Sequence, residues 1–221
     1  MIITGTQAKA ADRYAIDVLK IPSLTLMERA SRFVANAVLA AEKNAPAVIL
    51  CGVGNNGADG VCVGKMLREA GLQPKVLICG SLEKASWEFL RQLSEFKASG
   101  GIPEYIHKSE DFQSAAAEAV LLVDAAFGIG LKRPLEGIWK DVILAADSLD
   151  CCRIAVDVPS GINSDTGEAM GAYVRADETF TFGRNKTGLT TGTGAAAAGR
   201  ICVCDIGIPD EAYDMVMNTK E

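Results

Sequence analysis

Histidine and aromatic residues are scarce in this sequence. Its 221 residues include a single histidine, His107, and only 6% are aromatic. There is no CxxC pair either, so the sequence offers almost no candidate ligands for a zinc site of cysteine and histidine. A Ser–His–Asp triad would have to use His107, which lies beside no nucleophile motif. We therefore interpret His107 as a surface or loop residue.

An excess of positive charge and a long apolar run are also missing. Twenty-two basic residues against 28 acidic ones give a net charge of -6, which argues against an electrostatic grip on nucleic acid or anionic lipid. No apolar stretch approaches bilayer length, and residues 1–5 lack the features of a signal peptide. We expect a cytoplasmic protein with no nucleic-acid or membrane partner, in which backbone groups hold any phosphate.

The cysteines cannot form a complete disulfide framework, because their number, seven, is odd. Most lie inside apolar runs, so we expect buried, reduced thiols that act as small hydrophobic residues. The seven cysteines are Cys51, Cys62, Cys79, Cys151, Cys152, Cys202 and Cys204. The remaining composition, 49% hydrophobic and 23% charged, is typical of a globular protein, and we expect one domain over residues 1–221.

Short apolar runs alternate with segments of helical spacing along the chain. Strands are predicted at residues 47–51, 76–79, 120–123, 154–156, 179–182 and 201–204. Helices are predicted at residues 6–20, at 84–98, near 115 and at 138–149. Two more are predicted, one that begins at residue 25 and one that follows the glycine-rich break and ends at residue 70. A turn or loop is predicted at residues 190–199. This alternation predicts an α/β fold with a mostly parallel sheet and helices on both faces.

Ligands of such sheets bind beyond the carboxyl ends of the strands, so the loops there are of interest. The first loop, residues 52–60, matches GxGxxG at the start of a helix, where a phosphate can approach. An NAD-linked dehydrogenase would also need an acidic residue after the next strand, and Cys79-Gly80-Ser81 stands there. That enzyme class is disfavoured, and a tight turn with Asx capping stays an alternative. The polar side chains of the loop are Asn55, Asn56 and Asp59.

The second loop, residues 124–134, and the third, residues 157–163, each begin with an aspartate after an apolar strand. A buried carboxylate must be paired, capped or bound to a cation, and Asp157 could be only a cap. Lys132 and Arg133 suit an anionic ligand, although surface basic residues are usually only solvated.

Neighbouring strands would bring Asn56, Asp124 and Ser160 to the same edge of the sheet. Amide, carboxylate and hydroxyl oxygens together make a site for a hard cation. Their low total charge favours a monovalent ion.

These loops resemble the YjeF N-terminal domain family, the NAD(P)HX epimerases, and the resemblance covers nearly the whole chain. Five ordered motifs carry it. They are Pro22-Ser23-Leu24 with Met27-Glu28-Arg29-Ala30, Gly54-Asn55-Asn56-Gly57-Ala58-Asp59-Gly60, Val123-Asp124 with Phe127-Gly128-Ile129-Gly130-Leu131, Val156-Asp157-Val158-Pro159-Ser160-Gly161, and Asp205-Ile206-Gly207-Ile208-Pro209.

The resemblance implies a Rossmann-like three-layer α/β/α sandwich that interconverts the R and S forms of hydrated NADH and NADPH in nicotinamide nucleotide repair. It implies a potassium ion held by Asn56, Asp124 and Ser160, and an acid/base role for Asp157 beside the reacting ring. It further implies substrate contacts from Asn55, Asn56, Gly57, Ala58, Asp59, Gly128, Ile129, Gly130, Leu131, Lys132, Arg133, Pro134 and Asp157.

The sequence departs from the family pattern at three positions. Ala58, Val53 and Val158 stand where the family usually has Gly, Pro and Ile, and Ala58 falls at the tightest expected backbone approach. The family leaves open a homodimer and a fusion or association with an ADP- or ATP-dependent NAD(P)HX dehydratase domain.

A non-catalytic nucleotide- or protein-binding scaffold of the same fold is the alternative function. Such a scaffold has no need to keep four converging polar side chains. The presence of Asn56, Asp124, Asp157 and Ser160 together therefore favours an enzyme.

Overall fold

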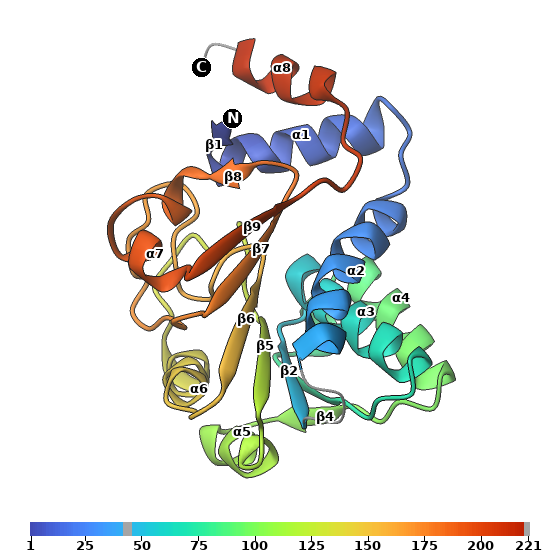
Figure 1. Cartoon of the computed structure of the whole chain (residues 1–221), viewed down its shortest axis with the longest axis vertical. Coiled ribbons are helices and arrows are strands. Elements are labelled where there is room, and N and C mark those ends of the chain that lie inside the picture. The colour runs from blue at the N-terminus through green and yellow to red at the C-terminus, as the bar shows by residue number, and fades with distance from the viewer. Residues whose placement is uncertain (42–45, 219–221) are drawn as a thin grey trace.

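A seven-stranded sheet forms the centre of the computed structural model, which describes residues 1–41 and 46–218 (Figure 1). The strand order is β4-β3-β2-β5-β6-β7-β9, and every neighbouring pair is parallel, which confirms the predicted α/β fold. The strands are β2 (Ala47–Cys51), β3 (Lys75–Cys79), β4 (Glu104–Ile106), β5 (Leu121–Ala125), β6 (Cys152–Val156), β7 (Glu178–Phe182) and β9 (Arg200–Cys204).

Helices cover both faces of this sheet, as expected for a three-layer sandwich (Figure 1). Ile49 of β2 faces one helical layer and its neighbour Leu50 faces the other, so the strand is apolar throughout. One layer contains α2 (Ser23–Ala41), α3 (Asn55–Glu69) and α4 (Trp87–Ala98), and the other contains α5 (Ser109–Ala116) and α6 (Gly137–Asp147).

A smaller group of elements closes one end of the molecule. Figure 1 shows α1 (Gly5–Asp17) and α8 (Asp210–Asn218) side by side, and β1 (Ile2–Ile3) pairs with β8 (Asn185–Lys186) in a second, parallel sheet. The side chains of Ala8, Ala11 and Ala15 on α1 pack against Ala212 and Tyr213 of α8 and neighbouring apolar groups. This packing brings α1 over the end of β7.

The order of the strands places three loops together. From β2 the chain builds outward through β3 and β4, then returns to β5 on the other side of β2 and continues to β6. The reversal between β2 and β5 is the switch point at which α/β sheets bind ligands. The first, second and third loops follow β2, β5 and β6, so all of them lie at or beside this point.

The predictions fail at the edge of the sheet and near the chain ends. Strand β4 was not predicted because Glu104 and Tyr105 are exposed, leaving only Ile106 as an apolar signal. The predicted turn or loop at 190–199 contains a short helix, α7 (Gly192–Ala197), which follows the turn η2 (Thr187–Leu189). The predicted helix at 84–98 is α4, which begins only at Trp87, and residue 84 ends the preceding turn η1 (Leu82–Lys84). Neither the two-residue strands β1 and β8 nor α8 was predicted.

The cysteine prediction is wrong for three of the seven thiols. Cys152 is exposed and Cys151 and Cys202 are half-buried, because they lie at the start of β6 and on the edge strand β9. All seven are free thiols. His107 is exposed, as predicted. In the part of the chain that the structure describes, no helix has the length and apolar character needed to cross a membrane.

Candidate functional site

The first loop carries the chain from β2 into α3 directly above the switch point. A Cβ atom on Gly57 would lie 1.8 Å from the carbonyl oxygen of Gly52, so the turn has room only for glycine. Helix α3 begins at Asn55, and the backbone N–H groups of its first turn point out of the helix without helical partners. This helix end therefore favours a bound anion.

Residues of the first turn of α3 point in different directions. Asn55 is exposed, whereas Ala58 is fully buried, with its methyl group in the core between helices and sheet. Asp59 is half-buried, and its backbone carbonyl accepts the hydroxyl hydrogen of Ser31 at 3.1 Å. The methyl group that distinguishes Ala58 from glycine therefore faces away from the open side of the loop.

Asp124, near the end of β5, is fully buried and held by neutral donors. The backbone N–H of Ser160 donates to Oδ2 at 2.8 Å, and the Ser160 hydroxyl donates to Oδ1 at 2.5 Å. The N–H of Ala126 adds a longer bond of 3.4 Å to Oδ1. Burial raises the pKa of Asp124 to about 6, although the bonds from Ser160 and Ala126 oppose this.

Asn56 reaches the same region from α3. A Cβ atom on Gly128 would lie 2.8 Å from Asn56 Oδ1, so glycine lets the second loop close over the amide. Asn56 Nδ2 is buried without a hydrogen-bond partner among the described residues. Next to Gly128, the N–H of Phe127 donates to Ser160 Oγ at 2.8 Å, and the Phe127 carbonyl oxygen lies 3.3 Å from it. The three expected ion ligands are thus gathered around the start of the second loop.

This donor set fits a hard monovalent cation. It combines an amide, a carboxylate, a hydroxyl and a backbone carbonyl, and its negative charge has no basic partner within residues 1–41 and 46–218. The same residues include no group of three or more His, Cys, Asp or Glu arranged to hold a metal ion. Oxygen ligands of low total charge suit potassium better than a tightly held divalent ion.

Asp157 follows β6 in a backbone conformation that side chains rarely adopt, with φ of 67°. Its Oδ1 accepts hydrogen bonds from Lys186 Nζ at 2.7 Å, Thr181 Oγ1 at 3.2 Å and the Phe182 N–H at 3.3 Å. No hydrogen bond to Oδ2 occurs among the described residues. The side chain of Asp157 is 10% exposed, so one oxygen is left for a bound molecule.

Two residues that the sequence patterns did not single out lie beside Asp157. Lys186 belongs to β8 and lies four residues after β7 ends, so the rule that strand ends carry chemistry could have found it. Asp12 has the same helical spacing as the buried residues Ala8, Ala11 and Ala15. A carboxylate in such an apolar stripe is itself a signal.

The carboxyl groups around Asp157 are electrostatically coupled. Burial raises the pKa of Asp12 to about 6, with Lys186 opposing the shift and Asp157 adding to it. Burial, together with the carboxylates of Asp157 and Asp12, raises the pKa of Asp59 well above its usual value. Two carboxyl groups, those of Asp12 and Asp157, therefore face the ammonium group of Lys186, and Asp59 faces both of these carboxyl groups.

The rest of the second loop lies mostly at the surface. Ile129 is half-buried and Leu131 is buried in the core, whereas Lys132 pairs with Asp165 at 3.3 Å. The exposed residues are Gly130, Lys132, Arg133 and Pro134. Because its side chain is buried, Leu131 could contact a molecule bound outside the core only through its backbone.

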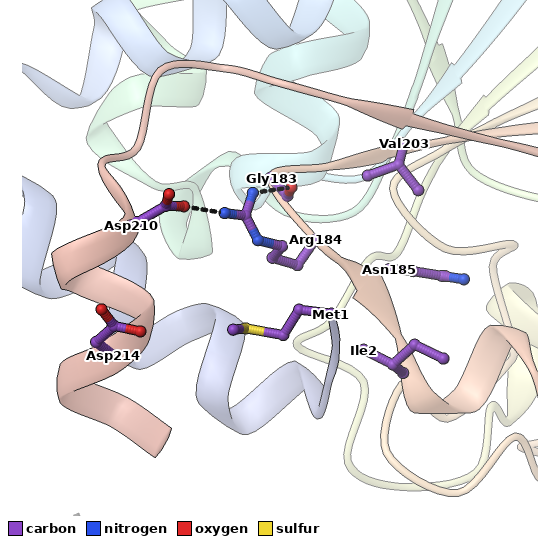
Figure 2. A pocket seen from close by; sticks show the side chains of 8 residues that line it. All are labelled: Met1, Ile2, Gly183, Arg184, Asn185, Val203, Asp210 and Asp214. Carbon is purple, nitrogen blue, oxygen red and sulfur yellow. Dashed lines mark hydrogen bonds and ion pairs between the residues drawn. The ribbon is translucent and has the colours of Figure 1, made fainter. Parts of the chain in front are cut away.

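A separate hollow of about 710 Å³ lies on the far side of β8 (Figure 2). Asn185 lines it, whereas the next residue of the strand, Lys186, points the other way toward Asp157. Arg184 pairs with Asp210 there and lies over the Tyr213 ring. None of the residues expected to bind substrate or metal lines this hollow. Its lining consists of Met1, Ile2, Gly183, Arg184, Asn185, Val203, Asp210 and Asp214.

Comparisons with known proteins agree with this geometry. A family model described as "YjeF-related protein N-terminus" matches residues 23–188. A Limosilactobacillus fermentum protein named NAD(P)H-hydrate epimerase is 43% identical over 209 residues, covering 92% of this chain and 95% of its own. A Levilactobacillus brevis protein of the same name is 39% identical, covering 93% and 94%. The crystal structure of the yeast protein ynu0, YNL200c, has the same fold, with a TM-score of 0.76, 18% identity and coverage of 92% and 87%. The chain belongs to the family of YjeF-related protein N-termini.

Proposed function

We propose that this chain is an isomerase that interconverts the R and S epimers of hydrated NADH and NADPH. Relatives named NAD(P)H-hydrate epimerase match it over nearly their full length. The observation that carries the proposal is Asp157, whose Oδ1 is fully engaged while Oδ2 has no partner among the described residues. A scaffold would gain nothing from such a buried, one-sided carboxylate.

The first and second loops hold the nucleotide in this proposal. Backbone N–H groups at the start of α3 bind a phosphate group, and the glycines of both loops allow close approach. Lys132 and Arg133 add positive charge at the rim, with Lys132 shared with Asp165. The nicotinamide-derived ring then lies beside Asp157.

Asn56, Asp124 and Ser160 hold the potassium ion. The ion, when bound, supplies positive charge to the Asp124 carboxylate and to substrate phosphate. The protein residues do the positioning, because Ser160 links the third loop to Asp124 and Asn56 links α3 to Gly128. The three loops therefore keep their relative positions.

Epimerisation inverts the ring carbon that bears the hydroxyl group. A carboxyl group donates a proton to this hydroxyl, the C–O bond breaks, and water leaves as the lone pair of the ring nitrogen forms a C=N bond. Water then adds to the opposite face, its oxygen forms the new C–O bond, and its surplus proton returns to the carboxylate. Asp157 performs both transfers, first as acid and then as base, so no proton is gained or lost.

The proposal is tested with a sample enriched in one epimer. Incubated with the protein and potassium chloride, the sample should reach the equilibrium mixture much faster than in buffer, as followed by chromatography that separates the epimers. Saturable binding of the hydrated nucleotide without acceleration would instead support the scaffold. A cytoplasmic location, one domain over residues 1–221, a homodimer and a dehydratase partner stay predictions.

A further inference from the structure

Lys186 is buried without an evident structural need. Of the lysines and arginines within residues 1–41 and 46–218, it alone is buried, with 2% of its surface exposed. Its ammonium donates to Asp157 Oδ1 and to the Phe182 carbonyl oxygen, both at 2.7 Å. Replacing a buried ion pair by apolar groups is often neutral or stabilising, so burial of this pair is poor evidence of a stabilising role.

The geometry of the contact gives Lys186 a directional effect on Asp157. Its ammonium, the Thr181 hydroxyl and the Phe182 N–H all donate to Oδ1, and within the described residues none donates to Oδ2. Lys186 is the only charged donor of the three, and charge-assisted hydrogen bonds are about twice as strong as neutral ones. The carboxylate is therefore fixed with Oδ2 turned outward.

Lys186 is also the cation among several acidic groups. Asp157 faces it from the loop after β6, Asp12 from α1 and the Cys204 thiol from β9. Asp59 on α3 faces Asp157 and Asp12 in turn. The remaining titratable groups around these carboxyl groups are Tyr213 beside Asp12, and Cys51 and Cys62 beside Asp59. Lys186 is thus the cation that acts on Asp157 and Asp12, while Asp59 faces those two carboxyl groups.

We propose that Lys186 is a positioning residue of the epimerase reaction, which holds Asp157 by Oδ1 so that Oδ2 meets the ring hydroxyl. The inference rests on the proposed function. Lys186 itself does not contact the substrate; it acts through the orientation and charge of Asp157. Its removal should therefore affect the proton transfers more than binding.

The test compares Lys186→Met with Lys65→Met. Lys65 forms an equally short ion pair with Glu95, 2.7 Å, between α3 and α4 and outside the site, and its side chain is 12% exposed. For Lys186→Met we expect kcat about 100-fold lower, because a misplaced catalytic group can cost this much, with KM little changed. The alkaline limb of the kcat profile should move to higher pH, because the carboxyl groups, which react first in their protonated form, lose their cation. Lys65→Met should keep the parent values of both.

Lys186→Arg and Thr181→Val keep the proposal testable if Lys186→Met does not fold, which circular dichroism would show. Lys186→Arg retains the charge, so the pH profile should stay in place while kcat falls less than in Lys186→Met. Thr181→Val removes one neutral donor to Oδ1 and should lower kcat about fivefold.

The following results would overturn the inference. One is a folded Lys186→Met with the kcat and pH profile of the parent, and another is activity lost only in proportion to the unfolded fraction. Parent-like kcat in both Lys186→Arg and Thr181→Val would have the same meaning. Failure of the parent protein itself to interconvert the epimers would instead remove the proposed function, so the two failures can be told apart.

Discussion

Asp124 lies near the end of β5 and Asp157 directly follows the neighbouring strand β6, yet their hydrogen-bond partners differ in charge. Every hydrogen bond to Asp124 comes from a neutral group, the hydroxyl and N–H of Ser160 and the N–H of Ala126. Asp157 is held by the ammonium of Lys186 as well as by neutral donors. Among the described residues, Asp124 thus has no cationic hydrogen-bond partner, whereas Asp157 has Lys186.

In the proposed function, this difference allows one site to hold both an ion and an acid–base group. A carboxylate surrounded by neutral donors and oxygens attracts a potassium ion, and the ion would compensate its burial. A carboxylate already paired through one oxygen does not need that ion and keeps the other oxygen for substrate. Both aspartates lie at the end of a strand, and the chain segments packed against each one determine whether it has a cationic partner.

The largest effect is expected for Asp157→Asn. Asparagine keeps the shape of the side chain but cannot accept and return the proton, so kcat should fall by about 10²- to 10⁴-fold. Chromatographic measurement of epimer interconversion checks this. Asp17→Asn, at an exposed position of α1, is the matched control and should turn over at the parent rate. Parent-like turnover of Asp157→Asn would remove Asp157 from the reaction.

Asp124→Asn should remove the response to potassium. In the parent, potassium that binds only the folded protein raises its stability by about 2.7 kcal/mol at 100 times Kd, so Tm should rise in potassium chloride relative to choline chloride. The variant lacks the only charged ligand of the three, and its Tm should be the same in both salts. A potassium-specific rise in Asp124→Asn equal to that of the parent would place the ion elsewhere.

Asp12→Asn tests the acidic surroundings of Asp157 through the pH dependence of stability. The pKa of Asp12 is raised by burial from 3.8 to about 6, so ionisation destabilises the folded state. This cost is absent below about pH 4, grows between about pH 4 and 6, and is constant above. Asparagine abolishes it, so the variant should be more stable than the parent at pH 8 by about 1–3 kcal/mol, and no more stable at pH 4. Urea unfolding at pH 4, 6 and 8 measures the difference, and a difference independent of pH would contradict it.

The sequence predicted the residues of this comparison that lie within the three loops, including both aspartates. Asp124 and Asp157 each follow a short apolar run, which can be recognised in the sequence, and parallel strands bring their ends to one edge. Lys186 could not be paired with Asp157 in the same way, because β8 is only two residues long and lies outside the central sheet. Asp12 comes from a helix outside the central sheet, so only the packing of α1 reveals its place. The short edge strand β4 was missed because it buries only one side chain.

The smallest effect is expected for Ala58→Gly, at the start of α3. Asn56 lies against Gly128 and Asp59 faces Asp157, whereas the methyl group of Ala58 between them packs in the core. Glycine in a helix is destabilising by about 1 kcal/mol, so the urea midpoint should fall, while KM for the hydrated nucleotide should stay at the parent value. A lower KM in the variant would mean that the methyl group limits the approach of substrate to the loop. An unchanged KM would mean that alanine in place of the family's usual glycine at position 58 affects only packing and leaves the binding of substrate at this loop unchanged.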